Sequence, residues 1–409
     1  MNKFGIFLEY VFTILSLIIY SGGILTLVVS GGAGQADVEV NYDTSSIRIF
    51  YFLIYLITFS LLVLRWRGVI EIINRDKYIW VLVALPLVSI LWSFDRAATL
   101  KDSSTMIGSS LFGLYLANRY TIKQQLQLLA MAGSVAICLS TLFVVFLPSY
   151  GIMTDIHAGA WRGIHTHKNG LGQFMGLNML VFIVLVVDNR RHYYLWLGLF
   201  ASVTLLVLSR STASMTNAVL VIPFLILLNT LRLRYELMIP TLLGILTITL
   251  TGSLLIKDNA DALAGSVGKN TTLTGRTAVW EFVGDMIQQQ PWVGYGYSGF
   301  WQGLDGPSAY VWRATQWNPT HPHNGLLQLS LDLGLLGVTI YLIGFWRCCL
   351  RALAYIRSTN KLEGIWPMAF LIYLVLLNLT ESHLVSSNSI IWILYVATYC
   401  SLLTGLKPN

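Results

Sequence analysis

Long apolar runs alternate with short polar segments along the whole chain. The runs approach the ~20 residues that a helix needs to cross the hydrocarbon core of a bilayer. They are rich in Leu and Ile and do not alternate strictly, which favours helices over barrel strands. The pattern predicts an all-α polytopic membrane protein, one integral-membrane domain over residues 1–409 with about twelve transmembrane helices. The predicted spans are 5–30, 47–64, 78–94, 104–118, 126–147, 169–187, 193–208, 213–230, 237–256, 324–346, 365–380 and 390–405.

The composition agrees with this pattern. Hydrophobic residues make up 55% of the chain, charged residues 11%, and the mean hydropathy is +0.66, which excludes a soluble protein. The net charge of +7 is explained by basic residues that face an anionic inner leaflet, so we expect the lipid bilayer and no nucleic acid as a partner. The sequence contains no P-loop, which disfavours an ATP-driven transporter, and we expect no cofactor.

The distribution of Lys and Arg predicts the orientation. If the N-terminus lies inside, the inner segments hold about 16 of the 26 basic residues, among them Arg65, Arg347 and Arg351. This bias places both termini in the cytoplasm. It also places residues 257–323, a large loop between the ninth and tenth spans, on the outer face. Residues 274–288 of this loop have an amphipathic pattern, with Thr274 as candidate N-cap, and predict a helix along the interface or over a cavity.

Polar residues gather at four places on the predicted outer face. These are residues 161–172, 209–212, 275–277 and 321–324. Arg162, Arg210 and Arg276 in the first three groups oppose the positive-inside trend. A guanidinium suits phosphate because its planar fork donates in parallel and stays charged. The alternatives are a helix-end residue that reaches to water for Arg210, a solvated loop charge for Arg276 and a loop residue for Arg162.

His323 is the candidate general base, because an imidazole can take a proton from a sugar hydroxyl near neutral pH. Asn324 beside it could orient the ring or a sugar, and an interfacial helix cap is the alternative for the pair. We find no convincing carboxylate base on the outer face. A metal site is a rival hypothesis, with His165, His167, His321 and His323 as four imidazole ligands. His165 and His167 are also typical of loop or packing residues.

A flippase or another secondary transporter would be expected to carry polar residues in the middle of the membrane. The distinctive residues here lie instead at one face. Asp332 is the main exception, and we expect it to be buried against neighbouring helices.

From about residue 80 to 345 the sequence resembles the O-antigen ligase and polymerase superfamily, most closely its exopolysaccharide polymerases of the succinoglycan type. The segments that carry this resemblance are Leu91–Leu100, Arg162–Gly172, Ser209–Thr212, Gly275–Thr277 with Trp280, and His323-Asn324 followed by Gly334 and Gly337. The resemblance implies a metal-independent, inverting glycosyltransferase of a bacterial inner membrane, with its active site on the periplasmic face. Donor and acceptor would be glycans linked to undecaprenyl diphosphate, and a chain-length regulator or export protein is a possible partner.

The resemblance also implies roles for individual residues. Catalytic roles are expected for His323, Arg210 and Arg276, with the arginines at the diphosphate. Substrate-binding roles are expected for Arg162, Lys168, Asn169, His321 and Asn324. A polymerase passes the glycan to another lipid-linked repeat, whereas a ligase passes it to lipid A-core. The segments around Asp95 and Arg162–Lys168 favour the polymerase.

Overall fold

The structure is a computed structural model that describes residues 3–32, 45–154, 157–231, 236–237, 276–359 and 361–405. Within these residues every named element is helical, and six helices are long and apolar enough to cross a membrane. The six are α1 (Lys3–Tyr20), α3 (Ser45–Leu64), α7 (Ile122–Phe146), α9 (Lys168–Asp188), α11 (Thr212–Thr230) and α16 (Gly325–Ser358). Shorter apolar helices are α5 (Tyr78–Val88), α10 (Tyr193–Leu208), α17 (Trp366–Asn378) and α18 (Ile390–Gly405). The prediction of an all-α polytopic membrane protein is confirmed.

Most predicted spans coincide with one helix, and the exceptions have physical causes. The first predicted span, 5–30, is divided into α1 and α2 (Ile24–Val29) because Gly22 and Gly23 adopt φ of 98° and 100°. The span 104–118 extends to α6 (Arg96–Arg119), because Asp95 accepts hydrogen bonds from two amides and caps the helix. The span 237–256 falls outside the described residues except for Leu237.

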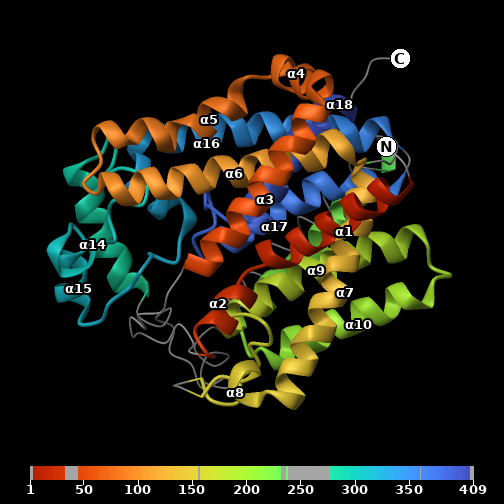
Figure 1. The fold of residues 1–409 in the computed structure, drawn as a ribbon, viewed down its shortest axis with the longest axis horizontal. Helices are drawn as coiled ribbons and strands as arrows, with labels where there is room; N and C mark the ends of the chain where they lie inside the picture. The colour runs from red at the N-terminus through yellow and green to blue at the C-terminus, as the bar shows by residue number, and fades with distance from the viewer. Residues whose placement is uncertain are drawn as a thin grey trace.

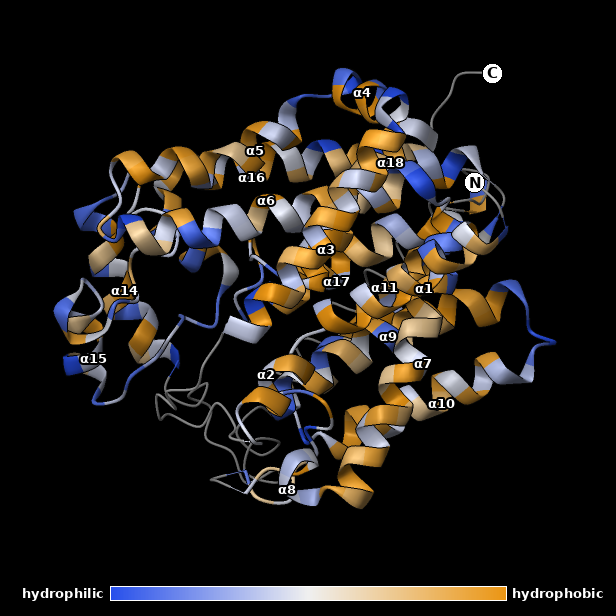
Figure 2. Ribbon diagram, in the orientation of Figure 1, coloured by the Kyte–Doolittle hydropathy of each residue, from blue (hydrophilic) through white to orange (hydrophobic). Residues whose placement is uncertain are grey.

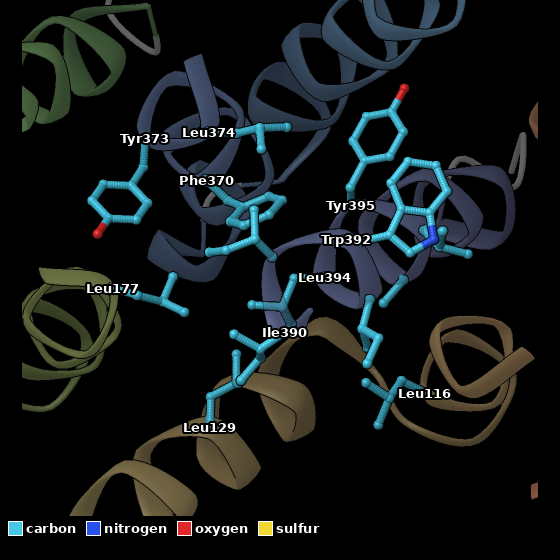
Figure 3. Packing of buried hydrophobic residues seen from close by; sticks show 14 of the residues in the cluster. Leu116, Leu129, Leu177, Phe370, Tyr373, Leu374, Ile390, Trp392, Leu394 and Tyr395 are labelled. Atoms are coloured by element: carbon cyan, nitrogen blue, oxygen red, sulfur yellow. The ribbon is translucent and has the colours of Figure 1, made fainter. Parts of the chain in front are cut away.

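The core lies where α17 and α18 pass through the centre of the bundle. Phe370 and Tyr373 of α17 belong to the same buried cluster as Trp392 and Tyr395 of α18 and leucines from α6, α7 and α9, and Figure 3 shows Tyr373 on the side of Leu177. Every residue of α18 from Ile390 to Leu403 is buried. α3, in contrast, exposes a row of large apolar side chains, including Phe50, Phe52, Leu53 and Leu56, and Figure 2 shows this helix largely in the hydrophobic colour. Such a face suits lipid contact.

Several ion pairs join α1, α3, α4 (Trp66–Arg75), α6 and α16, and the first turn of α1, α4 and the end of α18 lie at the top and upper right of Figure 1. Glu9 of α1 pairs with Arg65 at 2.7 Å and with Arg119 at 3.3 Å. Asp76, after α4, pairs with Arg347 at 2.9 Å. Arg65, Asp76, Arg119 and Arg347 come from segments that the charge pattern assigned to the inner face, whereas Glu9 lies within the first predicted span.

The opposite end carries a small helical cap formed by α14 (Arg276–Gln289) and α15 (Ala309–Thr315) (Figure 1). The apolar face of α14 packs through Val279, Val283 and Met286 against Phe300 and Val311 of the same cap. The structure has a helix from Arg276 onward within the predicted amphipathic segment, and it packs on its own loop and on α16. Its predicted N-cap, Thr274, lies outside the described residues.

α16 is broken near its beginning at Gly334, whose φ of 60° and ψ of −164° are not helical. Pro291 and Trp292 supply the missing hydrogen-bond acceptors at this break. Pro291 O accepts from Leu335 N at 2.8 Å, and Trp292 O accepts from Leu336 N at 3.0 Å. A Cβ at Gly334 would lie 2.4 Å from the backbone of Trp292. The first part of α16 is thus a half-helix, residues 325–333, that ends against the cap.

Candidate active site

The candidate active site is organised around Glu381, which follows α17 and is 6% exposed. His323 Nδ1 lies 3.1 Å from Glu381 Oε2. The amide of Asn169 donates to Glu381 Oε1 at 3.2 Å, and Arg276 Nη2 lies 3.6 Å from the same oxygen. One buried carboxylate therefore joins a histidine, an amide and an arginine from three separate regions of the sequence.

The same contacts bring together the first residues of four helices. Asn169 is in the first turn of α9, and its Oδ1 accepts from Ser211, the N-cap of α11, at 3.0 Å. Arg276 begins α14 and also donates to Thr380 O at 2.8 Å. Asn324 caps α16 next to His323. Helix N-termini carry partial positive charge, so these termini favour a negatively charged group such as the Glu381 carboxylate between them.

The local conformation of His323 is set by its neighbours. Its φ is 52°, in the left-handed region, between Pro322 and the N-cap Asn324. The backbone N–H of His323 donates to His321 Nδ1 at 3.2 Å, and the two rings lie 4.1 Å apart. Trp280 of α14 donates to Pro322 O at 2.7 Å and ties this turn to the cap. The His323 side chain remains 23% exposed, so one edge of the ring is open to a ligand.

The pKa values of the cluster follow from burial and charge. Burial, helped by the charge of His323, lowers the pKa of His321 to about 3, so this ring is neutral at physiological pH. Burial alone would raise the pKa of Glu381, but the hydrogen bond from His323 and the nearby imidazoles outweigh it and lower that pKa to about 2. Burial also lowers the pKa of His383. The site therefore holds an ionised carboxylate among histidines of which two favour the neutral form.

The segment Leu91–Leu100, singled out in the sequence, supports the site from a distance. Trp92 Nε1 donates to Val293 O at 2.9 Å, and Thr99 Oγ1 donates to Tyr297 O at 2.6 Å. Residues 293–297 are in turn held at the break of α16, where Tyr295 N donates to Leu331 O at 2.7 Å. These residues fix the half-helix that carries Asn324 at its beginning.

The structure brings five of the eight predicted site residues into this cluster and places the other three around or away from it. Asn169, Arg276, His321, His323 and Asn324 lie together through the contacts above. Lys168 is the first residue of α9, directly before Asn169. Arg210 is exposed with φ of 51°, directly before Ser211, and no partner of its guanidinium is recorded among the described residues. It stands at the edge of the cluster.

Arg162 has other contacts. It is 3% exposed, and its guanidinium donates to backbone oxygens of Tyr150 at 2.8 Å and Ser149 at 2.9 Å, and to Gly32 O. These bonds hold the loop before α9 to the chain segments around residues 32 and 150. The contacts support a structural role, and none of them joins Arg162 to Glu381.

Glu381 is the residue that sequence reasoning missed, and the expectation that no carboxylate lies beside His323 is wrong. The two positions are 58 apart in the sequence, and their contact depends on how α16 and α17 pack. The available signal was an acidic residue in a short segment between two apolar runs on the predicted outer face. Asp332 is buried as expected, and accepts from Gln328 at 3.0 Å and from Ser298 N at 3.2 Å.

The four-imidazole metal site is not assembled. His165 is 2% exposed and packs against Phe174, and His167 caps α9 with its ring 5.5 Å from that of His157. Among the described residues, the group with metal-ligand geometry consists of His321, His323 and Glu381.

The fold and this site define a polytopic helical membrane protein with a buried cluster of a carboxylate, a histidine and an arginine at one end of its bundle. Residues 197–342 match a family described as O-antigen ligase. The chain is similar to a protein of Rickettsia felis named "Putative polysaccharide ligase", at 24% identity over 54% of each chain. It is also similar to the exopolysaccharide production protein ExoQ of Rhizobium meliloti, at 21% identity over 65% of this chain and 63% of that protein. The chain thus spans about half to two thirds of the length of these relatives.

The resemblance to the O-antigen ligase and polymerase superfamily is therefore confirmed for the segment 197–342, which matches the family described as O-antigen ligase. The matched segment contains Arg210, Arg276 and His323. Glu381 lies outside it.

Proposed function

We propose that this protein is a glycosyltransferase that polymerises oligosaccharide repeats carried on undecaprenyl diphosphate, at the periplasmic face of an inner membrane. The observation that carries the proposal is the Glu381 cluster, in which a base candidate, an ionised carboxylate, an arginine and four helix N-termini meet. An imidazole can take a proton from the acceptor hydroxyl, and the positive groups can stabilise the negative charge of a diphosphate.

In the proposed reaction, the acceptor hydroxyl attacks the anomeric carbon of the donor sugar. The new carbon–oxygen bond forms as the bond to the diphosphate breaks, and the electron pair leaves with the diphosphate. His323 Nε2 takes the hydroxyl proton, while Glu381 Oε2 holds Nδ1–H at 3.1 Å and stabilises the imidazolium that forms. A single displacement of this kind inverts the anomeric centre and needs no metal ion.

Negative charge develops on the leaving diphosphate, and the arginines of the site can stabilise it. Arg276 is part-buried and anchored by Thr380 O, so its orientation is fixed before the substrate binds. Arg210 is exposed beside the N-cap of α11, and its guanidinium can turn to a diphosphate at the edge of the cluster. We assign Lys168, Asn169, His321 and Asn324 to the binding of the sugars, while Arg162 holds the loop that precedes Lys168.

A ligase that delivers the glycan to lipid A-core is the second candidate, because the matched family is described as O-antigen ligase and one relative is named a polysaccharide ligase. The lipid-linked products of a deletion strain separate the two. Accumulation of single repeats on the lipid carrier supports the polymerase. Accumulation of full-length polymer on the carrier would show a ligase, and unchanged lipid-linked products would contradict both.

The proposed sidedness has a matched test in two exposed residues. Asp305 lies in the cap, and Glu71 lies on α4 beside the ion pairs of the other end. In a background without the four native cysteines, Asp305→Cys should react with an impermeant thiol reagent in intact spheroplasts, and Glu71→Cys should react only after permeabilisation. The reverse pattern would place the Glu381 cluster in the cytoplasm.

A further inference from the structure

His321, His323 and Glu381 form a group of metal-ligand character in the candidate active site. Each residue offers one ligand atom, and the three atoms lie within 4.8 Å of one another. The closest pair, His323 Nδ1 and Glu381 Oε2, is separated by 3.1 Å. Two imidazoles and one carboxylate are a common zinc ligand set, and ligand atoms of one zinc ion lie at about 2.0–2.2 Å from it. A small movement of the side chains would therefore close the site.

The surroundings suit a site with an open position. His323 is 23% exposed, so a water molecule can complete a tetrahedral set. Neutral imidazole and ionised carboxylate are the states that a metal requires, and His321 and Glu381 favour these states. Arg276, 3.6 Å from the second oxygen of Glu381, opposes a cation and leaves Oε2 as the available ligand atom. The ligand atoms favour a metal ion and the charge of Arg276 opposes it, so we expect metal binding to be reversible.

We propose that His321, His323 and Glu381 bind one Zn²⁺ ion and that the bound ion inhibits the transferase. The metal forms a bond to His323 Nδ1 in place of the proton that faces Glu381, and this proton, the single one on the neutral ring, moves through solvent to Nε2. A neutral imidazole bound through Nδ1 therefore carries its proton on Nε2. The lone pair that would accept the proton of the sugar hydroxyl is then lost. The inhibitory half of this inference rests on the proposed function, whereas the binding half does not.

The binding half is tested on the purified full chain in detergent with Co²⁺ as a spectroscopic probe. Wild type should give the visible absorption of a tetrahedral Co²⁺ site at one equivalent, and Zn²⁺ should abolish it. His321→Gln and Glu381→Gln should each weaken binding by at least about 10-fold. His192→Gln, at the other end of the bundle, is the matched control and should bind as wild type does. Calorimetry in two buffers of different ionisation enthalpy, at mildly alkaline pH, should give the same binding enthalpy, because two neutral imidazoles and an ionised carboxylate bind the ion without net release of a proton. Absence of the spectrum, or equal binding by all variants, would overturn the site.

The inhibitory half is tested by transfer between lipid-linked repeats, with Zn²⁺ added and then removed by EDTA. Loss of activity at the Zn²⁺ concentration that displaces Co²⁺, with full recovery in EDTA, supports the proposal. Binding that depends on the cluster but leaves activity unchanged would overturn the inhibition and would also remove His323 as the base. Loss of activity in EDTA that returns with Zn²⁺ would overturn both the inhibition and the metal-free reaction, while the site itself would stand.

Discussion

Glu381 Oε2 lies 3.1 Å from His323 Nδ1, although the two residues are carried by different helix ends. The carboxylate is buried and ionised, so it holds the proton of the ring on Nδ1 and directs Nε2 away from itself. The pair has the arrangement of a base and the group that orients it. The proposed chemistry depends on this contact more than on any other.

The first prediction concerns the charge of Glu381. Glu381→Gln keeps the shape but removes the charge that stabilises the imidazolium, so transfer should fall by about 10²-fold or more. Glu381→Asp should recover part of the loss, and the pH profile of the Gln variant should differ from that of wild type. Glu363→Gln, near Lys123 at the other end of the bundle, is the control for removal of a carboxylate. Wild-type rates in Glu381→Gln would show that the carboxylate has no part in the reaction.

The second prediction concerns the planar guanidinium group of Arg276. Arg276→Lys keeps the charge but cannot contact Thr380 O and a diphosphate in parallel, so activity should fall by about 10²-fold at equal protein level. Arg210→Lys should also be impaired. Arg313→Lys on α15, an exposed position, should be unaffected. If both Arg276→Lys and Arg210→Lys transfer glycan as wild type does, the arginines do not act as phosphate ligands.

The third prediction concerns the break in α16. Gly334→Ala forces a side chain into a left-handed conformation, which costs about 1–2 kcal/mol, and places a Cβ 2.4 Å from the Trp292 backbone. The thermal unfolding midpoint in detergent should fall, and activity should fall with it because the half-helix positions Asn324. Gly284→Ala on α14 meets no atom within 4 Å and should be neutral or stabilising. Equal midpoints for the two variants would contradict this account of the break.

The fourth prediction concerns pH and His165. Burial lowers the pKa of His165 from 6.5 to about 4, and the ring packs against Phe174. As the pH falls below 6.5, His165 becomes protonated in the unfolded chain but stays neutral in the folded chain. The free energy of unfolding therefore decreases until about pH 4, where the folded chain is protonated as well. The decrease from this residue amounts to at most about 3 kcal/mol. The unfolding midpoint of His165→Gln, measured between pH 4 and 8, should therefore decline less than that of wild type. Parallel curves would show that His165 is not protonated on unfolding.

The helices could be predicted from the sequence because burial in lipid requires long apolar runs, which are visible residue by residue. α10, for example, has the predicted bounds Tyr193–Leu208. The break of α16 could not be predicted, since one glycine within an apolar run gives no indication that another segment will bond to its neighbours. The break at Gly334 is stable because Pro291 O and Trp292 O accept hydrogen bonds from the two residues that follow it.

The same distinction applies to the site. Arg276, His323 and Asn324 stand out in the sequence because polar residues at a membrane boundary are rare and need partners. Glu381 has the same property but lies far along the chain, and only the packing of α16 against α17 joins it to His323. The backbone contacts of Arg162 also could not be predicted, because a guanidinium that suits phosphate suits backbone carbonyl groups equally well.

The central claim is that His323 accepts the proton of the acceptor hydroxyl without a metal ion. The direct measurement is the rate of glycan transfer by purified protein on its own lipid-linked repeats in the presence of EDTA. Wild type should remain active, and His323→Ala should lose about 10²–10⁴-fold while it keeps the size-exclusion profile of wild type. His165→Ala and His167→Ala should lower the rate of glycan transfer less than His323→Ala does. Full activity of His323→Ala in this assay would contradict the claim.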